Sequence, residues 1–278
     1  MDIAVIGLGL IGGSLARTIK LHTDHRVLGA DTDPEALAQA RRMDAIDGEL
    51  NDEKLRGCQV VLVALYPGDI VTWTRDHARF FAADALVIDC GGVKQAVMDR
   101  VTPFAKGQPW HFIGGHPMAG REFSGFRYAR DDLFDNASMI LTPLPEEELS
   151  VLQRARDFFM DLGFRRVQFT TPRIHDEMIA YTSQLAHIVS SAYVKSALAD
   201  RHKGYSAGSF ADMTRVARLN EGMWTELFMD NRDALLRELE GLIDRLGAYR
   251  DALAKEDSEA LKTLLREGRE VKESLEEV

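Results

Sequence analysis

The N-terminal segment, residues 1–31, constrains the fold of this chain more than any other part. The apolar run Ile3–Ile6 leads directly into the segment GLGLIG (residues 7–12), a GxGxxG pattern followed by a helical stretch through Lys20. A second apolar run, Arg26–Ala30, ends at Asp31, about 20 residues beyond the glycines. Strand, glycine turn, helix, strand and terminal acid together are typical of the first unit of a dinucleotide-binding parallel sheet.

Each glycine of this pattern has its own physical task. Gly7 permits the tight turn, Gly9 lets the backbone approach a pyrophosphate, and Gly12 lets the helix lie close on the strand. The first amides of that helix then face the phosphates. A carboxylate at Asp31 accepts hydrogen bonds from the ribose hydroxyls and repels a 2′-phosphate, which predicts NAD rather than NADP. The predicted cofactor site comprises Gly7, Leu8, Gly9, Leu10, Ile11, Gly12, Asp31 and, after the next parallel strand, Ala64 and Leu65.

Further strand-like runs alternate with helical stretches through the first half of the chain. They are apolar along their length, as parallel strands are when helices cover both faces of the sheet. We predict strands at 60–64, 85–89, 111–114, 138–142 and 166–169, with a helix at 146–162. From Pro172 onward the pattern predicts only helices, at 173–200, 209–218, 221–249 and 256–276. We therefore expect an α/β Rossmann-type doubly wound, mainly parallel sheet in residues 1–171 and an all-α domain in residues 172–278.

The third predicted helix carries one apolar face along its whole length. A helical domain of this size has little room to bury such a face alone, which predicts a homodimer formed mainly through the helical domains. A self-contained helical bundle is the alternative. The residues that recur at helical spacing are Trp224, Phe228, Asn231, Leu235, Leu239, Leu242 and Leu246.

Composition narrows the class of protein. The formal net charge of −10 over 278 residues argues against nucleic acid as a partner. The longest apolar run, residues 3–16, is shorter than the ~18 residues that a membrane span needs, so no membrane association is expected. Cys58 and Cys90 are too few for a disulfide framework or a structural zinc site, and we expect no metal. No basic leader precedes the first strand, so we expect a cytoplasmic protein.

A second informative segment, HPMAGRE (residues 116–122), follows the predicted strand at 111–114. It places an imidazole, His116, beside the predicted cofactor site, where the carboxyl ends of the strands lie. A histidine has an unperturbed pKa near ~6.5 and can take a proton from an alcohol as hydride leaves the same carbon. The cofactor would accept the hydride, so the two segments together predict a dehydrogenase with His116 as its base.

The chain resembles the prephenate dehydrogenase family of tyrosine biosynthesis over essentially its whole length. In that family, prephenate loses hydride to NAD from the hydroxyl-bearing carbon while its ring carboxylate departs as carbon dioxide, giving 4-hydroxyphenylpyruvate. The resemblance implies that His116 accepts the proton of the substrate hydroxyl. It rests on GLGLIG with Asp31, DCGGVK (89–94), GGHPMAGRE (114–122), TSQLAH (182–187), and DMTR (212–215) with Trp224 beyond.

The same resemblance implies a set of substrate-binding residues. Arg215 supplies a fixed cation for a dianionic substrate, and Asp212, one helical turn earlier, orients its guanidinium. Gln184 and His187 share one helical face toward the interdomain cleft, although family members often carry histidine in place of Gln184. Glu122 either gates or orders the site, or it is a solvated loop carboxylate.

The chain departs from the family pattern at Gly92, where many relatives have a serine whose hydroxyl orients the substrate hydroxyl and the catalytic histidine. Either a water, a backbone amide or Lys94 takes over that task, or this chain positions the substrate differently. The choice between prephenate and arogenate stays open. An inward-pointing Arg121 would favour the anionic side chain of prephenate.

Two interpretations that place the chain in other functional classes also remain. A hydroxyacid dehydrogenase of similar two-domain architecture would use a lysine base in the helical domain, and Lys195 is the candidate. A catalytically silent NAD-binding sensor protein is the other, because Gly92 replaces the serine of the family pattern.

Overall fold

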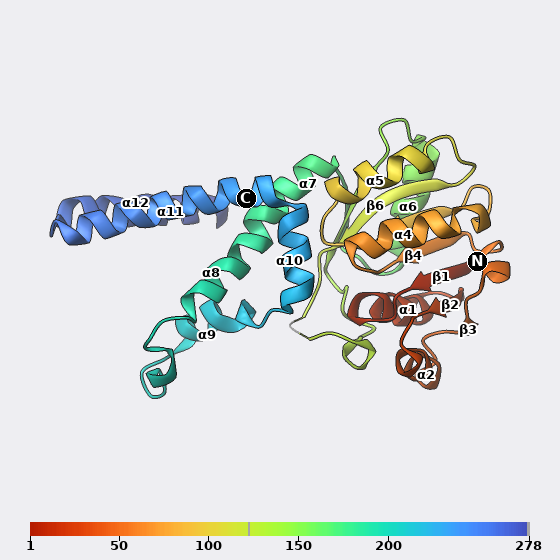
Figure 1. The fold of residues 1–278 in the computed structure, drawn as a ribbon, viewed down its shortest axis with the longest axis horizontal. Helices are drawn as coiled ribbons and strands as arrows, with labels where there is room; N and C mark the ends of the chain where they lie inside the picture. The colour runs from red at the N-terminus through yellow and green to blue at the C-terminus, as the bar shows by residue number, and fades with distance from the viewer. Residues whose placement is uncertain (122, 277–278) are drawn as a thin grey trace. The chain divides into compact units, whose positions relative to one another are not determined.

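The computed structural model describes residues 1–121 and 123–276. It forms two compact units, Met1–Asn231 and Arg232–Val278. The first unit is built on one sheet, whose strands are β1 (Asp2–Ile6), β2 (Arg26–Ala30), β3 (Gly48–Glu49), β4 (Val60–Val63), β5 (Leu86–Asp89), β6 (His111–Pro117), β7 (Ser138–Pro143) and β8 (Arg166–Phe169). Their order in space is β3-β2-β1-β4-β5-β6-β7-β8 (Figure 1).

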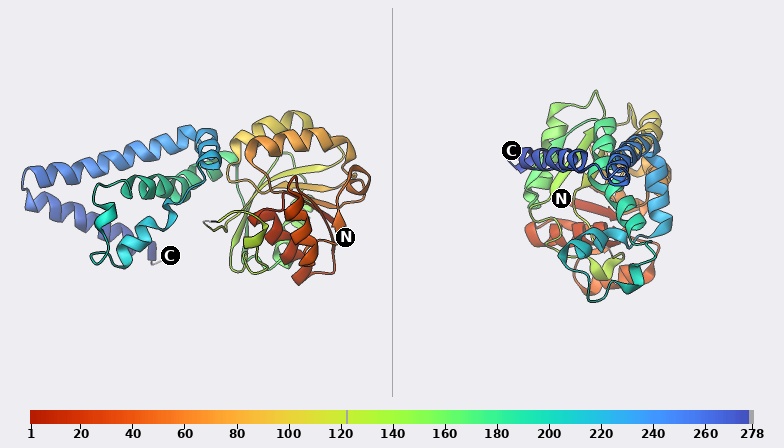
Figure 2. Two further views of the ribbon diagram at one scale, coloured as in Figure 1. Left: turned by 60° about the horizontal axis from the view of Figure 1, so that its bottom comes forward. Right: turned by 90° about the vertical axis from the view of Figure 1, so that its left-hand side faces the viewer.

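Helices cover both faces of this sheet. Alternate residues of each strand point to opposite faces, so the apolar strands contribute to two cores. The covering helices are α1 (Leu10–His22), α2 (Pro34–Arg42), α3 (Asp52–Leu55), α4 (Pro67–His77), α5 (Gln95–Ala105) and α6 (Leu149–Asp161). On β1, Ile3 and Val5 belong to the apolar core under α1, α2 and α6. Ala4 and Ile6 belong to the core on the other face, under α3, α4 and α5. Figure 2 shows the sheet lying between α4 and α5 on one side and α1 on the other.

The expected α/β, mainly parallel Rossmann-type sheet is confirmed, with two details that the sequence pattern did not reveal. The two-residue strand β3 pairs with β2 and is too short for a periodic signal. Strand β7 runs antiparallel to β6, and β8 runs parallel to β7. Parallel neighbours need a crossover, usually a helix. The described part of the connection from β6 to β7 contains only the 3-10 turn Phe126–Tyr128, which suits a reversal of direction.

Beyond the sheet the chain is helical, but two of the predicted helices are wrong in detail. The predicted helix 173–200 ends at Tyr193 and contains a wide π-helical turn, and the predicted helix 221–249 is interrupted at Asn231. The apolar face from 224 to 246 therefore does not lie on a single helix. The segments are α7 (Pro172–Ile179), the π turn (Ala180–Gln184), α8 (Leu185–Tyr193), α9 (Gly208–Thr214), α10 (Glu221–Asp230), α11 (Arg232–Ala254) and α12 (Ser258–Glu276), with 3-10 turns at 199–201 and 215–217. Another 3-10 turn, at 78–80, lies between α4 and β5.

The interruption at Asn231 has a local cause. Its backbone leaves the helical region, with φ −116° and ψ 24°. Its buried side chain donates from Nδ2 to the carbonyl oxygen of Asp176 at 2.8 Å and to Oε1 of Gln184 at 2.7 Å. An amide side chain that is held by such partners can stabilise a helix end that apolar spacing alone does not indicate.

The second unit is a pair of helices, α11 and α12. The hydroxyl of Tyr249 on α11 donates to the carbonyl oxygen of Leu264 on α12 at 3.1 Å. The short connection between them includes Glu256, whose φ of 54° lies in the left-handed region. Large apolar side chains stay exposed on both helices, at Leu236, Ile243, Leu246, Leu253, Leu265, Val271 and Leu275.

Both cysteines, Cys58 and Cys90, are free and buried. Burial raises the pKa of the Cys58 thiol to about 11, which suits a structural rather than a reactive role. Among the described residues, no helix combines the length and the apolar character needed to cross a membrane.

Candidate active site

The glycine turn between β1 and α1 has the geometry that its sequence predicts. Gly7 has φ 82°, in the left-handed region that favours glycine. A Cβ at Gly12 would lie 1.8 Å from the carbonyl oxygen of Gly7, so the helix packs against the turn as closely as a glycine allows. A Cβ at Gly9 would meet no atom within 4 Å. Gly9 thus leaves an open backbone face, as expected where a ligand approaches.

Asp31 lies at the end of β2, beside this turn. Its Oδ2 accepts the backbone N–H of Leu8 at 2.6 Å, and its Oδ1 accepts the N–H of Asp33 at 2.8 Å. No side chain caps the N-terminus of α1, so its first amides are available to an anion. An aligned carboxylate and an uncapped helix N-terminus fit the ribose and pyrophosphate of NAD.

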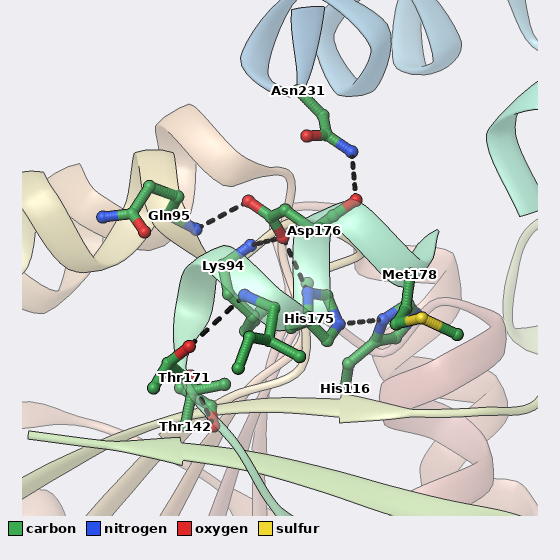
Figure 3. Close-up of polar contacts among 12 residues, drawn as sticks. Lys94, Gln95, His116, Thr142, Thr171, His175, Asp176, Met178 and Asn231 are labelled. Carbon is green, nitrogen blue, oxygen red and sulfur yellow. Dashed lines mark hydrogen bonds and ion pairs between the residues drawn. The ribbon is translucent and has the colours of Figure 1, made fainter. Parts of the chain in front are cut away.

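His116 lies near the carboxyl end of β6, at the edge of the sheet where ligands bind in such folds. Its Nδ1 is 2.9 Å from Nε2 of His175, in the first turns of α7. Nδ1 of His175 in turn is 2.6 Å from Oδ1 of Asp176. Figure 3 shows the three side chains in a row. We call this row, Asp176–His175–His116, the proton relay.

The proton relay determines which nitrogen of His116 is free to act. A carboxylate only accepts, so Nδ1 of His175 must donate to Asp176. With that proton on Nδ1, neutral His175 can only accept at Nε2, and Nδ1 of His116 donates to it. The remaining Nε2 of His116 is then an acceptor. Burial, and next the nearby His175 and Lys94, lower the pKa of His116 well below its usual 6.5, so the ring is a neutral base at pH 7.

Asp176 is itself fixed by the start of α5. Its Oδ1 accepts the N–H of Lys94 and its Oδ2 accepts the N–H of Gln95, both at 2.8 Å. These are among the first amides of a helix, which carry partial positive charge and favour a carboxylate. The side chain of Asp176 therefore links α5, after β5, to His116 on β6.

A buried ion pair lies next to the proton relay. The ammonium of Lys94 contacts Oδ1 of Asp89, and both side chains are completely buried. Nζ of Lys94 also donates to the carbonyl oxygen of Gly115, the neighbour of His116, at 2.5 Å. Burial raises the pKa of Asp89, while the charge of Lys94 opposes that shift. Since its ammonium is bound to these partners, Lys94 is not available to replace the hydroxyl that Gly92 lacks.

Helix α10 contacts the loops that follow β4 and β5. Oε1 of Glu226 accepts the N–H of Gly68, at the start of α4, at 2.8 Å. A Cβ at Gly92 would lie 3.3 Å from Cδ2 of Leu227, so this leucine occupies the space next to the glycine. Arg100 of α5 pairs with Asp230 at 3.4 Å. The helix thus lies against the same sheet edge as His116.

Both halves of the chain match family models. Residues 15–168 match the model described as prephenate dehydrogenase, nucleotide-binding domain, and residues 171–267 match the one described as prephenate dehydrogenase, dimerization domain. The chain belongs to the prephenate dehydrogenase family.

Named relatives agree with this membership. A prephenate dehydrogenase of Lactococcus lactis is 31% identical over 99% of this chain and 77% of its own length. A cyclohexadienyl dehydrogenase of Zymomonas mobilis is 30% identical over 98% of this chain and 95% of its own. Among solved structures, A. aeolicus prephenate dehydrogenase in complex with hydroxyphenyl propionate and NAD+ has a TM-score of 0.87 at 26% identity, covering 99% and 98% of the two chains. Synechocystis arogenate dehydrogenase has a TM-score of 0.83 at 25% identity, covering 99% and 100%.

Membership in the prephenate dehydrogenase family confirms three predictions. The chain is a dehydrogenase, it has the Rossmann-type fold with a helical part after it, and its cofactor is NAD. These findings remove both readings from other classes. Lys195, the base of the hydroxyacid dehydrogenase alternative, is exposed beyond the end of α8.

Two of the substrate residues expected of a prephenate dehydrogenase are held by protein partners. Gln184 is almost fully buried at the end of the π turn, where its Nε2 donates to the carbonyl oxygen of Leu227 at 3.1 Å and its Oε1 accepts from Asn231. Nδ1 of His187 lies 3.0 Å from the carbonyl oxygen of Val216. The ring of His187 packs on that of Trp224, with centroids 4.0 Å apart.

The other predicted residues lie on exposed segments or outside the description. Asp212, on α9, and Arg215, just after it, have exposed side chains. Arg121 is also exposed. Glu122 lies outside the described residues.

Sequence reasoning missed His175 and Asp176, which form a hydrogen-bonded row with Nδ1 of His116. The available signal was an adjacent imidazole and carboxylate at the start of the first helix after the sheet. The two histidines of the relay are 59 residues apart, and no local spacing connects them.

Proposed function

We propose that this chain is a prephenate dehydrogenase that converts prephenate and NAD to 4-hydroxyphenylpyruvate, carbon dioxide and NADH in tyrosine biosynthesis, with His116 as the base. The observation that carries the residue assignment is the proton relay, because it leaves Nε2 of a neutral His116 as an acceptor at the carboxyl edge of the sheet. Arogenate dehydrogenase activity, which would give tyrosine directly, is the alternative. It is kept because a Synechocystis arogenate dehydrogenase has a similar structure.

The cofactor is assigned to the glycine turn and Asp31. NAD supplies the hydride acceptor. Gly7, Gly9 and Gly12 leave the backbone close to the pyrophosphate, and the carboxylate of Asp31 faces the adenosine ribose. Leu8, Leu10 and Ile11 belong to the same turn, while Ala64 and Leu65, which follow β4, complete the predicted cofactor site.

The hydroxyl-bearing ring carbon would give hydride to NAD as the hydroxyl proton passes to Nε2 of His116 and a carbonyl forms. The bond between the ring and its carboxylate breaks, carbon dioxide leaves, and the bonding pair makes the ring aromatic. The former carbonyl oxygen, now a phenolate, then takes a proton back from His116 to give the phenol. The imidazolium that forms is stabilised by His175 and by the carboxylate of Asp176, which hold it without a change of geometry.

Substrate binding is assigned to residues of the helical part. Arg215 would bind a substrate carboxylate in a bidentate manner, oriented by Asp212. His187 and Gln184 would shape the pocket, the latter mainly through its bonds to Leu227 and Asn231. Glu122 is assigned as a gating residue. Gly92, backed by Leu227, leaves the orientation of the substrate hydroxyl to His116 and to water.

The assembly is part of the same proposal. We assign residues 1–171 to an NAD-binding domain and residues 172–278 to a substrate-binding and dimerisation domain of a cytoplasmic homodimer. Support comes from the family model described as a dimerization domain and from the exposed leucines of α11 and α12.

NADH formation by the purified protein tests this function. The protein is incubated separately with prephenate and with arogenate, each with NAD and with NADP. Rapid reduction of NAD with prephenate alone is the expected result. Preference for arogenate would keep the mechanism and replace the substrate. Reduction of NADP as fast as NAD would contradict the role of Asp31, and no turnover with either substrate would contradict the function.

A further inference from the structure

We infer that Asn231, which terminates α10, is a positioning residue that holds the proton relay in line with His116. The inference rests on the proposed function, since it concerns the proton transfer to His116. It adds a residue that the proposed pocket does not include and that acts through the backbone of Asp176, with a second contact to Gln184.

The contacts of Asn231 converge on the far end of the relay. Its Nδ2 donates to the backbone carbonyl oxygen of Asp176 at 2.8 Å (Figure 3) and to Oε1 of Gln184 at 2.7 Å. Asn231 and Gln184 are both buried. The side-chain amide of Asn231 thus donates one hydrogen bond to α7 and one to the π turn that follows it.

Asp176 is consequently held from two sides. Its carboxylate is fixed by the first amides of α5, through Lys94 and Gln95. Its backbone carbonyl oxygen accepts from Nδ2 of Asn231 in addition to the N–H of Ala180. The carboxylate of Asp176 must align His175 with His116. A restraint on the backbone of Asp176 keeps this carboxylate in place, because supporting hydrogen bonds hold such groups in the productive geometry.

Asparagine has the chemistry that this position needs. Both acceptors of Nδ2 are oxygens. A side chain without a donor would remove one hydrogen bond from the carbonyl oxygen of Asp176, which also accepts the N–H of Ala180, and would remove the bond that Oε1 of buried Gln184 accepts. Nε2 of Gln184 is already donating to the carbonyl oxygen of Leu227, which prevents Gln184 from simply flipping to compensate. The network therefore has one consistent orientation.

Helix α10 also supplies a matched control. Asn220 is the residue before the helix, and its exposed side chain accepts the N–H of Met223 at 2.9 Å. Asn220→Ala and Asn231→Ala are the same substitution at opposite ends of one helix. Only the second removes a contact to Asp176.

The test measures kcat, KM, the NAD dissociation constant and the pH profile of kcat/KM for both variants, well below their unfolding temperatures. For Asn231→Ala we expect kcat to fall roughly 10-fold to 100-fold, as small misplacements of reacting groups do. The acid limb of the pH profile should move up toward pH 6.5, because water that enters a loosened site reduces the desolvation that lowers the pKa of His116. His175 and Lys94, which face His116, also lower this pKa. NAD binding should be unchanged, and Asn220→Ala should keep the wild-type kcat and acid limb.

Other results would overturn the inference. They are a wild-type kcat and acid limb in Asn231→Ala, or equal losses in the two variants, which would indicate only a general weakening of α10. If Asn231→Ala does not fold, Asn231→Asp keeps the size of the side chain, but its carboxylate cannot donate to either oxygen at neutral pH. It should lose kcat in the same way, and an unchanged kcat would again contradict the inference. Failure of the wild-type protein to oxidise prephenate or arogenate would instead refute the proposed function.

Discussion

A single proton on the imidazole of His116 decides whether this side chain can act as a base. The ring must be neutral, and its proton must be on Nδ1 so that Nε2 can accept. Burial supplies the first condition by lowering the pKa, and the row His175–Asp176 supplies the second by fixing the tautomer. Neither condition follows from the presence of a histidine at the end of a strand; both follow from its neighbours.

Replacement of His116 by asparagine should separate catalysis from cofactor binding. We expect kcat to fall by ~10²–10⁴, the usual contribution of a general base. The NAD dissociation constant, measured by titration of protein fluorescence, should stay at the wild-type value because His116 lies apart from the glycine turn in sequence and element. An unchanged kcat would refute the assignment of the base.

The pH profile should reflect the lowered pKa of His116. The neutral form is the active one, so kcat/KM should stay constant as the pH falls through 6.5 and decline only below it. An imidazole with an ordinary pKa would already be half protonated at that pH. The profile is measured with prephenate and NAD at saturating cofactor. An acid limb at or above pH 6.5 would mean that His116 is not desolvated as described.

At the scale of the element, the residues of the candidate site lie on short turns and helix ends. In the glycine turn, each glycine meets a different structural requirement. Gly7, Gly9 and Gly12 are equivalent in the sequence pattern but not in space. One adopts a left-handed backbone, one leaves an open face, and one has no room for a side chain. The same contrast applies to α10, where Asn220 and Asn231 stand at opposite ends and only one contacts the proton relay.

Alanine at two of these glycines should have opposite consequences. Gly12→Ala places a methyl group 1.8 Å from the carbonyl oxygen of Gly7, and we expect a loss of about 1–3 kcal/mol in unfolding free energy, as overpacking causes. The added methyl of Gly9→Ala meets no atom of the described residues within 4 Å, so the unfolding temperature should stay near wild type while NAD binding weakens. Thermal unfolding and NAD titration of both variants test this. Normal NAD binding by Gly9→Ala would show that the pyrophosphate does not approach this face.

At the scale of the whole molecule, the chain divides into a large unit with the sheet and a small helical pair. The small unit, α11 with α12, leaves Leu246 and Leu253 56% and 63% exposed, two turns apart on one face of α11. Exposed apolar rows of this kind are typical of surfaces that are buried by association. The proposed homodimer gives this unit the partner that it needs.

Charge introduced on that face should disrupt the dimer. The double variant Leu246→Glu, Leu253→Glu should be monomeric in light scattering, with half the mass of a wild-type dimer of two 31.1 kDa chains, because burying two carboxylates is costly. The control variant Leu21→Glu, Leu149→Glu changes two exposed leucines of the sheet-containing unit, 62% and 79% exposed, and should stay dimeric. A double variant on α11 that remains a dimer would place the interface elsewhere.

The sequence by itself determined the Rossmann-type sheet, the glycine turn and the position of Asp31, and it predicts His116 as the base. These features are local: a strand, a turn and the next strand lie within a few residues, and their apolar spacing and backbone needs can be read from residue types. The tertiary structure alone decided the reversal of β7, the break at Asn231, the pairing of Lys94 with Asp89 and the proton relay. Each joins residues that are distant in the chain or depends on whether a buried donor finds an acceptor, and no periodicity records such contacts.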